Sequence, residues 1–471
     1  MNAKIFFGSV EASKDKISER KSPYDGEVVS TAPVCDADDV KTALRIAQIA
    51  AGDAKASPLS QRCNWLLDVA NKLQENKEDI AKTITDEVGK PISFARVEVD
   101  RCIETVTLSA ETMRTMHGET INTDAMASGK KTLSYFSRVP VGVVVAITPF
   151  NFPLNLVAHK LAPALVAGNS VVLKPTPEAP LTAYKFAKLF IESKYAVKDA
   201  LSVVYGDAEV GSALITSDIP RVISFTGSVP VGEIITKNAG IKKVSLELGG
   251  NAATYIDKSA DLDLAASRCA LGAFVNSGQV CISLQRIYVN ADIYDEFAVK
   301  MADETKKLVI GSPYDEDTFL GPVIDDESAQ RAMGWVESAI EEGAKSLLTP
   351  HREGRMFHPC VMADVRDDMA IVCEEVFAPI VSLIKVKDFS DALPRMNNSP
   401  YGLQFSVFTN DLNITKRAID ELDAGGIVIN DMPTLRFDIQ PYGGVKLSGV
   451  GREGPKFAIE EMTEIKSVII C

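Results

Sequence analysis

The sequence predicts an α/β fold of two lobes with a cleft between them. From residue 141 onward, short apolar runs alternate with helix-like segments, which is typical of βαβ units in a helix-covered parallel sheet. The first series of runs is VGVVVAIT, SVVLK, LSVVYG, RVISFTG and KVSLELG, separated by helix-like segments at 154–167, 179–194, 208–216 and 230–238. Small-residue turns follow several of these strands, at the place where open α/β sheets bind ligands.

The second lobe is predicted by another α/β series after residue 248. It contains a short strand ending at 255–256, a helix over 261–277, the strand RIYVN and a helix over 292–307. Later strands are expected within VCEEVFAPIVSLIKV, YGLQFSVFT and GGIVIN. Ala and Leu recur at helical spacing over 34–118, so this region should be helical. KTLSYFSR and the C-terminal EEMTEIKSVIIC are predicted to be strands.

Composition excludes several classes of function. The chain has 471 residues and a net charge of −14, which argues against a nucleic-acid partner, because phosphate contacts need clustered Lys and Arg. Eight scattered cysteines without a CxxC pair are typical of reduced thiols, and the four dispersed histidines make a metal site unlikely. The N-terminal MNAKIFFGSVEASKDK lacks a long apolar h-region, and the longest apolar run, 141–147, is too short for a membrane span. We therefore expect a cytoplasmic protein without a membrane partner.

Two residues stand out as candidates for covalent and acid–base chemistry. Cys281 follows the turn-prone NSG, and a thiol there is an accessible nucleophile if it faces a cleft. Most free cysteines are instead small buried hydrophobes, so position alone leaves both interpretations open. Glu247 stands inside an apolar run before Gly-Gly, where burial would raise its pKa and suit it to general-base work. The alternative is a strand-end glutamate that turns to solvent.

Two further patterns suggest an oxyanion site and a phosphate site. Asn151, in TPFNFPLN, could donate a hydrogen bond to a developing oxyanion, or could simply cap a helix or a turn between prolines. FTGSVPVG, residues 225–232, joins a strand to a helix whose first N–H groups could hold a pyrophosphate. Its spacing differs from the dinucleotide GxGxxG, so the pattern by itself is weak.

Taken together, seven motifs resemble those of the aldehyde dehydrogenase superfamily. They are TPFNFP, VVLKPTPEAP, FTGS, LELGGN, GQVC, EEVFAP and PYGGVKLSGVGREG, in the family's order from about residue 20 to the C-terminus. The resemblance implies NAD(P)-dependent oxidation of an aldehyde to a carboxylate. It also implies a Rossmann-type cofactor domain over 1–118 and 140–247, a catalytic α/β domain over 248–440, and a small β oligomerisation arm over 119–139 and 455–471. The arm implies a homodimer or homotetramer.

The resemblance also assigns roles to single residues. Cys281 matches the nucleophile that forms a thioester, Asn151 and the Cys281 backbone N–H match the oxyanion hole, and Glu247 matches the general base. The positions that match cofactor contacts are Lys174, Thr176, Gly227, Ser228, Val231, Leu248, Glu375 and Phe377. Lys174 would contact the adenosine ribose, and Glu375 and Phe377 the nicotinamide ribose and ring.

Single residues bear on which cofactor and which substrate the protein binds. NAD-preferring members carry Glu three residues after the lysine, but Pro177 stands here with Glu178 one step later, which predicts that NADP is accepted. His159-Lys160 and Arg436 resemble the lactaldehyde and non-phosphorylating glyceraldehyde-3-phosphate dehydrogenase branch. The expected substrate contacts are Arg114, Phe152, Val280 and Ile282.

Arg114 is interpreted either as the contact to an anionic tail or as a solvated helix arginine. Val280 is apolar where phosphate-binding members tend to carry Arg, which favours a small hydroxyaldehyde such as lactaldehyde, or a semialdehyde, over a phosphorylated aldehyde.

Other functions remain open at this point. A CoA-acylating dehydrogenase would generally lack the base, so Glu247 argues against it. A glyceraldehyde-3-phosphate dehydrogenase of the non-phosphorylating type, a non-enzymatic structural relative and an unrelated thiol hydrolase are the remaining alternatives. The hydrolase would need a histidine close to Cys281.

Overall fold

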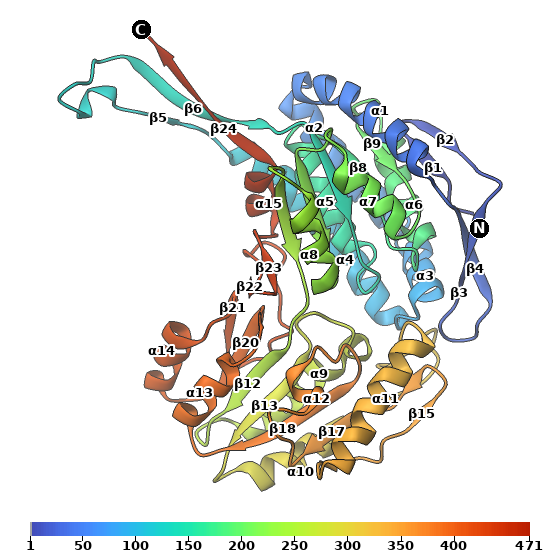
Figure 1. Ribbon diagram of the computed structural model, residues 1–471, viewed down its shortest axis with the longest axis vertical. Helices are drawn as coiled ribbons and strands as arrows, with labels where there is room; N and C mark the ends of the chain where they lie inside the picture. The colour runs from blue at the N-terminus through green and yellow to red at the C-terminus, as the bar shows by residue number, and fades with distance from the viewer. Residues whose placement is uncertain (1) are drawn as a thin grey trace.

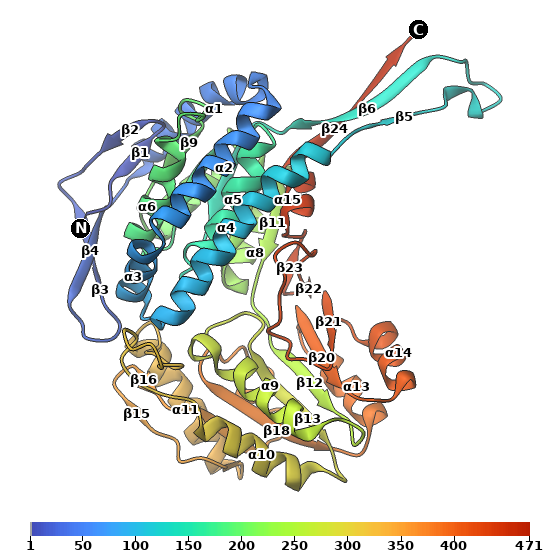
Figure 2. The ribbon, with the colours of Figure 1, turned by 180° about the vertical axis from the view of Figure 1, so that it is seen from behind.

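The computed structural model describes residues 2–471 and has two lobes and a thin arm that projects away from both (Figure 1). Each lobe is built on its own mainly parallel sheet with helices packed against it, and Figure 2 shows the same arrangement from behind. The two-lobed α/β architecture is therefore as the sequence predicts. Within residues 2–471, no helix has both the length and the apolar character that crossing a membrane requires.

The sheet of the first lobe has the strand order β2-β1-β9-β8-β7-β10-β11-β23. Its strands are β1 (Ile5–Phe7), β2 (Val10–Ala12), β7 (Val143–Ile147), β8 (Ser170–Lys174), β9 (Leu201–Val203), β10 (Val222–Thr226), β11 (Lys243–Glu247) and β23 (Gly449–Val450). The five strands from β7 to β11 are parallel, and nearly all their side chains are buried, which explains their continuous apolar sequences. The chain runs from β7 outward to β9 and then returns to β10 on the other side of β7. The carboxyl ends of β7 and β10 therefore border a crevice at a switch point.

Helices cover this sheet. They are α1 (Ala37–Ala56), α2 (Leu59–Glu75), α3 (Lys77–Val88), α4 (Ile92–Thr115), α5 (Asn155–Val166), α6 (Pro180–Ile191), α7 (Ala208–Thr216) and α8 (Val229–Asn238). Asp36 caps α1 through a capping box with Asp39, and Gly89 closes α3 at a φ of 69°. A hairpin of β3 (Ile17–Lys21) and β4 (Val28–Pro33) precedes them.

The second lobe has a seven-stranded sheet in the order β14-β17-β18-β13-β12-β20-β21. These strands are β12 (Ala252–Ile256), β13 (Leu284–Asn290), β14 (Lys345–Ser346), β17 (Cys360–Ala363), β18 (Ile380–Val386), β20 (Gln404–Phe408) and β21 (Gly426–Ile429). All neighbouring pairs are parallel except β14 with β17. The helices are α9 (Leu262–Phe274), α10 (Tyr294–Lys306), α11 (Asp326–Glu341), α12 (Ala370–Cys373), α13 (Phe389–Asn397) and α14 (Leu412–Glu421). Short pairs β15 (Arg352–Glu353) with β16 (Met356–Phe357) and β19 (Tyr401–Gly402) with β22 (Val445–Lys446) complete it.

The arm is a three-stranded antiparallel sheet. β24 (Thr463–Ile470) pairs along its whole length with β6 (Leu133–Pro140), and β5 (Glu119–Thr120) pairs with the other edge of β6. A short 3-10 turn, η1 (Thr123–Ala125), lies between β5 and β6.

The predicted C-terminal boundary of the arm is too early. α15 (Pro455–Glu461) packs against α5 and α4 in the body of the first lobe, and only β24 leaves the body. The preceding β23 adds an antiparallel strand to β11. The expected arm segment 455–471 is therefore part body and part arm, because the helix has an apolar face that the first lobe covers.

Candidate active site

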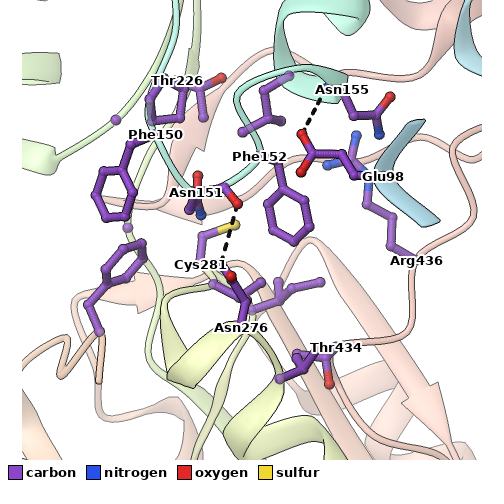
Figure 3. Close-up of a pocket in the computed structure, with 18 of the residues that line it drawn as sticks. Glu98, Phe150, Asn151, Phe152, Asn155, Thr226, Asn276, Cys281, Thr434 and Arg436 are labelled. Atoms are coloured by element: carbon purple, nitrogen blue, oxygen red, sulfur yellow. Dashed lines mark hydrogen bonds between the residues drawn. The ribbon is translucent and has the colours of Figure 1, made fainter. Parts of the chain in front are cut away.

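A cavity of about 640 Å³ lies between the lobes, at the carboxyl ends of β7, β10 and β11. Cys281 and Asn151 both line it, and Figure 3 shows them close together near its centre. Phe150 and Thr226 lie on one side of them, and Phe152, Glu98 and Arg436 on the other (Figure 3). The cavity therefore extends in two directions from the candidate nucleophile.

Cys281 is presented by a strained turn after α9. Asn276, Ser277 and Gly278 have φ values of 52°, 56° and 71°, so three successive residues are left-handed. Only glycine fits the third position, since a Cβ on Gly278 would lie 2.2 Å from the carbonyl oxygen of Ala378. Side chains hold the turn: Ser277 Oγ donates to Gly321 O at 2.8 Å, and Gln279 Oε1 accepts from Ile324 N at 2.9 Å. The fold thus fixes the segment NSGQVC in one conformation.

The Cys281 thiol has one side-chain hydrogen-bond partner. Its Sγ lies 3.0 Å from the hydroxyl oxygen of Tyr442. Burial raises the pKa of Cys281 to about 11, an effect that Tyr442 and Arg436 oppose and that Glu375 and Glu247 reinforce. The ligand-free thiol is therefore largely protonated at neutral pH. Sequence reasoning missed Tyr442; its only signal was a phenol within the PYGG motif.

Asn151 lies four residues after β7 and points its amide toward the segment before Cys281. Its Nδ2 donates to Gln279 O at 3.0 Å, while Oδ1 has no hydrogen-bond partner among the described residues. α5 begins only at Asn155, so Asn151 does not cap it. One N–H of the amide is thus oriented by the protein, and the second is available to a ligand. Its role as an oxyanion donor stays a prediction.

Glu247, the last residue of β11, is 3% exposed and lies behind the cavity wall, not on it. Neither carboxylate oxygen has a hydrogen-bond partner within residues 2–471. Burial, and then the charge of Glu453, raise the pKa of Glu247 well above its usual range, although Arg436 and Lys160 oppose the shift. Burial thus favours the protonated form of this carboxyl. Gly443 packs against it, since a Cβ there would lie 2.8 Å from Glu247 Oε1.

The cofactor candidates form one side of the cavity and continue beyond it. Gly227 and Ser228 line the cavity at the start of α8, whose N-cap Ser228 makes no side-chain cap bond, so the first N–H groups of the helix are free for an anion. Val231 is 41% exposed on the same helix, and Leu248 lines the cavity next to Gly232. Their contacts with a cofactor stay predictions.

The remaining candidates for cofactor contacts are Lys174, Thr176, Glu375 and Phe377. Lys174 ends β8, and burial lowers its pKa while Glu178 and Asp207 partly offset that effect. The hydroxyl of Thr176 donates to Glu178, so the displaced carboxylate is held beside the lysine. Glu375 accepts a hydrogen bond from Gly250 N at 2.9 Å and lines the cavity.

Phe377 also lines the cavity, and its ring meets that of Phe150 edge-on with 6.0 Å between centroids. A helix N-terminus without a side-chain cap and a carboxylate line this cavity, and a buried lysine ends strand β8; these groups fit a dinucleotide.

Three of the four predicted substrate contacts line the cavity, and one does not. Phe152, Val280 and Ile282 all line the cavity. Arg114 does not: it is exposed near the end of α4, with its Nη2 3.5 Å from Asn64 Oδ1. The same helix instead brings Arg101, about three and a half turns earlier, to the cavity. The expectation for Arg114 is corrected, because helical periodicity gives the face of a helix but not which end of it meets the cleft.

Glu98 on α4 holds part of the cavity wall in place. Glu98 accepts hydrogen bonds from the backbone N–H groups of Leu154 and Asn155, at 2.9 and 3.1 Å, and so holds the start of α5. Its carboxylate also pairs with buried Lys90, whose Nζ lies 3.9 Å from the ring centroid of Phe152. This ion pair positions the aromatic ring next to Asn151.

The far wall holds an arginine cluster of Arg101, His159, Lys160, Arg436, Asp438 and Glu453. Arg101 donates to both oxygens of Asp438, at 2.9 and 2.8 Å, and His159 Nε2 lies 3.0 Å from Asp438 Oδ1. Arg436 Nη2 and Lys160 Nζ each lie 3.1 Å from an oxygen of Glu453. Burial and Arg436 lower the pKa of His159, so the ring is neutral at pH 7. Three cations thus face two carboxylates, and the cluster has one positive charge in excess.

Among residues 2–471, no group of three or more His, Cys, Asp or Glu side chains is arranged to hold a metal ion. A histidine near Cys281, which a thiol hydrolase would require, is also absent from the residues that line the cavity.

Comparison with known proteins identifies the family. A sequence profile described as the aldehyde dehydrogenase family matches residues 10–468. The chain belongs to this family. It is therefore an oxidoreductase, and the predictions of family, fold class and enzyme class are confirmed.

Two relatives and one solved structure show the range of similarity. The 3-sulfolactaldehyde dehydrogenase of Priestia aryabhattai is 43% identical over 466 residues, 98% of this chain and 96% of that protein. The lactaldehyde dehydrogenase of Methanococcus aeolicus is 42% identical over 457 residues, 96% of this chain and 97% of that protein. The glyceraldehyde-3-phosphate dehydrogenase of Methanocaldococcus jannaschii, solved with NADP, has a TM-score of 0.93 and 39% identity and covers 97% of this chain and 100% of its own.

The burial of Glu375 predicts how the stability of this aldehyde dehydrogenase depends on pH. Burial raises the pKa of Glu375 to about 7 from an ordinary value of 4.5. The folded chain therefore binds this proton more tightly than the unfolded chain, and stability is lost as pH rises from about 4.5 through about 7. We expect Glu375→Gln to stabilise the ligand-free protein by about 1–3 kcal/mol at pH 8 and by little at pH 5. Urea unfolding at both pH values measures the free energy of unfolding of each variant. The exposed neighbour Glu374, changed to Gln, is the control, and an equal effect of both variants at pH 8 would contradict the assignment.

Proposed function

We propose that this aldehyde dehydrogenase oxidises a short aldehyde, with a hydroxyl or an anionic group at its far end, using NAD or NADP and a thioester on Cys281. The observation that carries the proposal is the position of the Cys281 thiol. It stands in one cavity between residues that fit a dinucleotide and the arginine cluster. An aldehyde carbon bonded to Sγ would thus lie between a hydride acceptor and a cationic wall.

The chemistry follows from these positions. Cys281 loses its proton as Sγ bonds to the aldehyde carbon, and the oxygen receives hydrogen bonds from Asn151 Nδ2 and from the backbone N–H of Cys281. Gly227 and Ser228 would hold the pyrophosphate of a bound NAD(P), and Glu375 and Phe377 its nicotinamide ribose and ring, so that the nicotinamide would accept hydride from the carbon bonded to Sγ and leave a thioester. Glu247 would then rotate into the cavity, lose its proton to solvent there, and as a carboxylate take a proton from the water that attacks the thioester.

NADP acceptance is proposed from the adenosine end of the site. Glu178 stands one residue later than the carboxylate that would repel a 2′-phosphate, and it is bonded to Thr176. Lys174 stays available to a phosphate on the same wall. The relative from Methanocaldococcus jannaschii binds NADP, which supports the proposal.

The charge of the far wall bears on the substrate. Arg101 is partly exposed to the cavity and is preorganised by its two bonds to Asp438. The excess positive charge of the arginine cluster favours a carboxylate or sulfonate at the far end of the substrate. The relative from Priestia aryabhattai is named for a sulfonated hydroxyaldehyde, in agreement. Val280 contributes no cation, which disfavours a phosphorylated substrate.

The arm supports a proposal of self-association. β24 forms an edge of the three-stranded sheet, and it exposes Ile465, Ile469 and Ile470 by 60%, 62% and 53%. Exposed apolar side chains on an unpaired edge strand are unfavourable unless another strand or surface covers them. We infer that a second copy of the chain covers the arm, in a homodimer or homotetramer.

The role of Cys281 is tested by Cys281→Ser. Because a serine hydroxyl ionises far less readily than a thiol, we expect kcat to fall by at least about 10³-fold with both NAD and NADP. Reduced-nicotinamide absorbance measures the rate over a panel of lactaldehyde, 3-sulfolactaldehyde, succinic semialdehyde and glyceraldehyde 3-phosphate, with and without CoA. Cys471→Ser, at the exposed end of the arm, is the control and should keep full activity. Full activity of Cys281→Ser, or a strong preference for NAD, would refute the corresponding part of the proposal.

Arg101→Met tests the anionic end of the substrate. A hydrogen bond to a charged group contributes about 1.5–3 kcal/mol, so kcat/KM for 3-sulfolactaldehyde or succinic semialdehyde should fall about 10- to 100-fold. The value for lactaldehyde should change less than about three-fold. Arg114→Met, on the same helix but outside the cavity, is the matched control. An equal loss for the charged and uncharged aldehydes would show that Arg101 serves only the fold.

The double substitution of Ile465→Asp with Ile469→Asp tests the arm. Two charges on the exposed edge strand should prevent its burial, so the assembly should become smaller than that of the wild type. Light scattering after gel filtration measures the mass of each species. Lys466→Asp, an exposed change on the same strand, controls for charge alone. A wild-type monomer, or an unchanged mass for the double variant, would contradict the inference.

A further inference from the structure

Within residues 2–471, Tyr442 is the one side chain that forms a hydrogen bond with Cys281 Sγ. Its hydroxyl oxygen lies 3.0 Å from Cys281 Sγ, and this is the only hydrogen bond of that hydroxyl within residues 2–471. The side chain is 7% exposed and lines the cavity. A buried phenol normally finds a hydrogen-bond partner, and here the partner is the candidate nucleophile.

The phenol is held rigidly. Its backbone exchanges two hydrogen bonds with Glu453, Tyr442 N to Glu453 O at 3.1 Å and Glu453 N to Tyr442 O at 2.7 Å. The guanidinium of Arg436 lies over its ring, 3.7 Å from the centroid. Arg436 itself is fixed by Glu453 and lies 3.4 Å from Asp438. The hydroxyl therefore has little freedom to leave the sulfur.

We propose that Tyr442 is a further catalytic residue, whose O–H donates to the Cys281 thiolate and so favours loss of the thiol proton to water. The proposal rests on the proposed function, since it concerns the same nucleophile. In the neutral pair either atom can donate, but once the sulfur is ionised only the phenol carries a hydrogen. A charge-assisted hydrogen bond stabilises the ionised form selectively.

The surroundings of the pair suit this role. The charged or titratable groups that act most strongly on Cys281 besides Tyr442 are Arg436, Glu375 and Glu247. Arg436 favours the thiolate, whereas the two carboxyl groups oppose it. The same guanidinium over the phenol ring draws electron density from it and strengthens the O–H as a donor. Tyr442 and Arg436 together thus counteract the cost of an anion in a buried site.

Tyr442→Phe removes only the hydroxyl and keeps the ring under Arg436. We expect the rate of Cys281 alkylation by iodoacetamide to fall about ten-fold at each pH from 6 to 10, as a rise of about one unit in the pKa of the thiol would produce. In this reaction the thiolate displaces iodide, so its rate follows the fraction of ionised sulfur. Mass spectrometry of the Cys281 peptide, sampled over time from pH 6 to 10, measures the rate without turnover, aldehyde or cofactor.

The controls separate this proposal from the proposed function. Tyr184→Phe also loses one bonded hydroxyl, from a bond to Glu11 at 2.7 Å far from the cavity, and should leave the profile unchanged. An unchanged profile for Tyr442→Phe would overturn the proposal, and faster alkylation would show that the phenol accepts the thiol proton and holds it. If Cys281→Ser keeps activity while Tyr442→Phe shifts the profile, the hydrogen bond stands and the proposed function fails. Circular dichroism and the melting temperature establish that Tyr442→Phe is folded before alkylation is measured.

Discussion

The ion pairs of Asp438 and Glu453 connect the two lobes, and the geometry of the candidate site depends on that connection. Both carboxylates lie in the segment that returns from the second lobe, and their partners Arg101, His159 and Lys160 lie on α4 and α5 of the first lobe. Removing one member of such a buried pair typically costs about 3–5 kcal/mol, because it leaves a charge without compensation. The geometry of the cavity is therefore tied to a network whose members span more than three hundred residues of sequence, as Arg101 and Asp438 are 337 apart.

Burial, more than this network, keeps the proton on Cys281 and favours the protonated form of Glu247 in the ligand-free protein. Desolvation dominates the pKa shifts of Cys281 and Glu247, and the fixed charges around them compensate only in part. A protein that stored a thiolate and a carboxylate in this cavity would have to desolvate two anions a short distance apart. Protonation of both groups in the ligand-free site avoids that cost. In the proposed mechanism, Tyr442 and Arg436 assist ionisation of the sulfur when the aldehyde is bound.

The sequence predicted the parts of the fold that local patterns determine. β8 spans Ser170–Lys174 as SVVLK indicated, and α7 spans Ala208–Thr216, because fully buried strands and capped helices leave clear signatures. β2 and β3, with the sequences VEA and ISERK, escaped because their side chains are mostly exposed and lack an apolar pattern.

At the candidate site, motif resemblance located Cys281, Asn151 and Glu375, and the structure brings them to one cavity. The contact between Cys281 and Tyr442 joins residues 161 apart, and only the packing of the two lobes creates it.

The course of the chain also constrains how the protein is made. β23 adds a strand to the first lobe's sheet, α15 packs on α5, and β24 completes the arm, yet β23 follows β11 by about two hundred residues. The edge of the first sheet at β11 therefore stays unpaired during translation until these residues have been synthesised. An unpaired strand edge in a partly synthesised chain favours aggregation, so the first lobe is exposed to that risk until its last strand pairs.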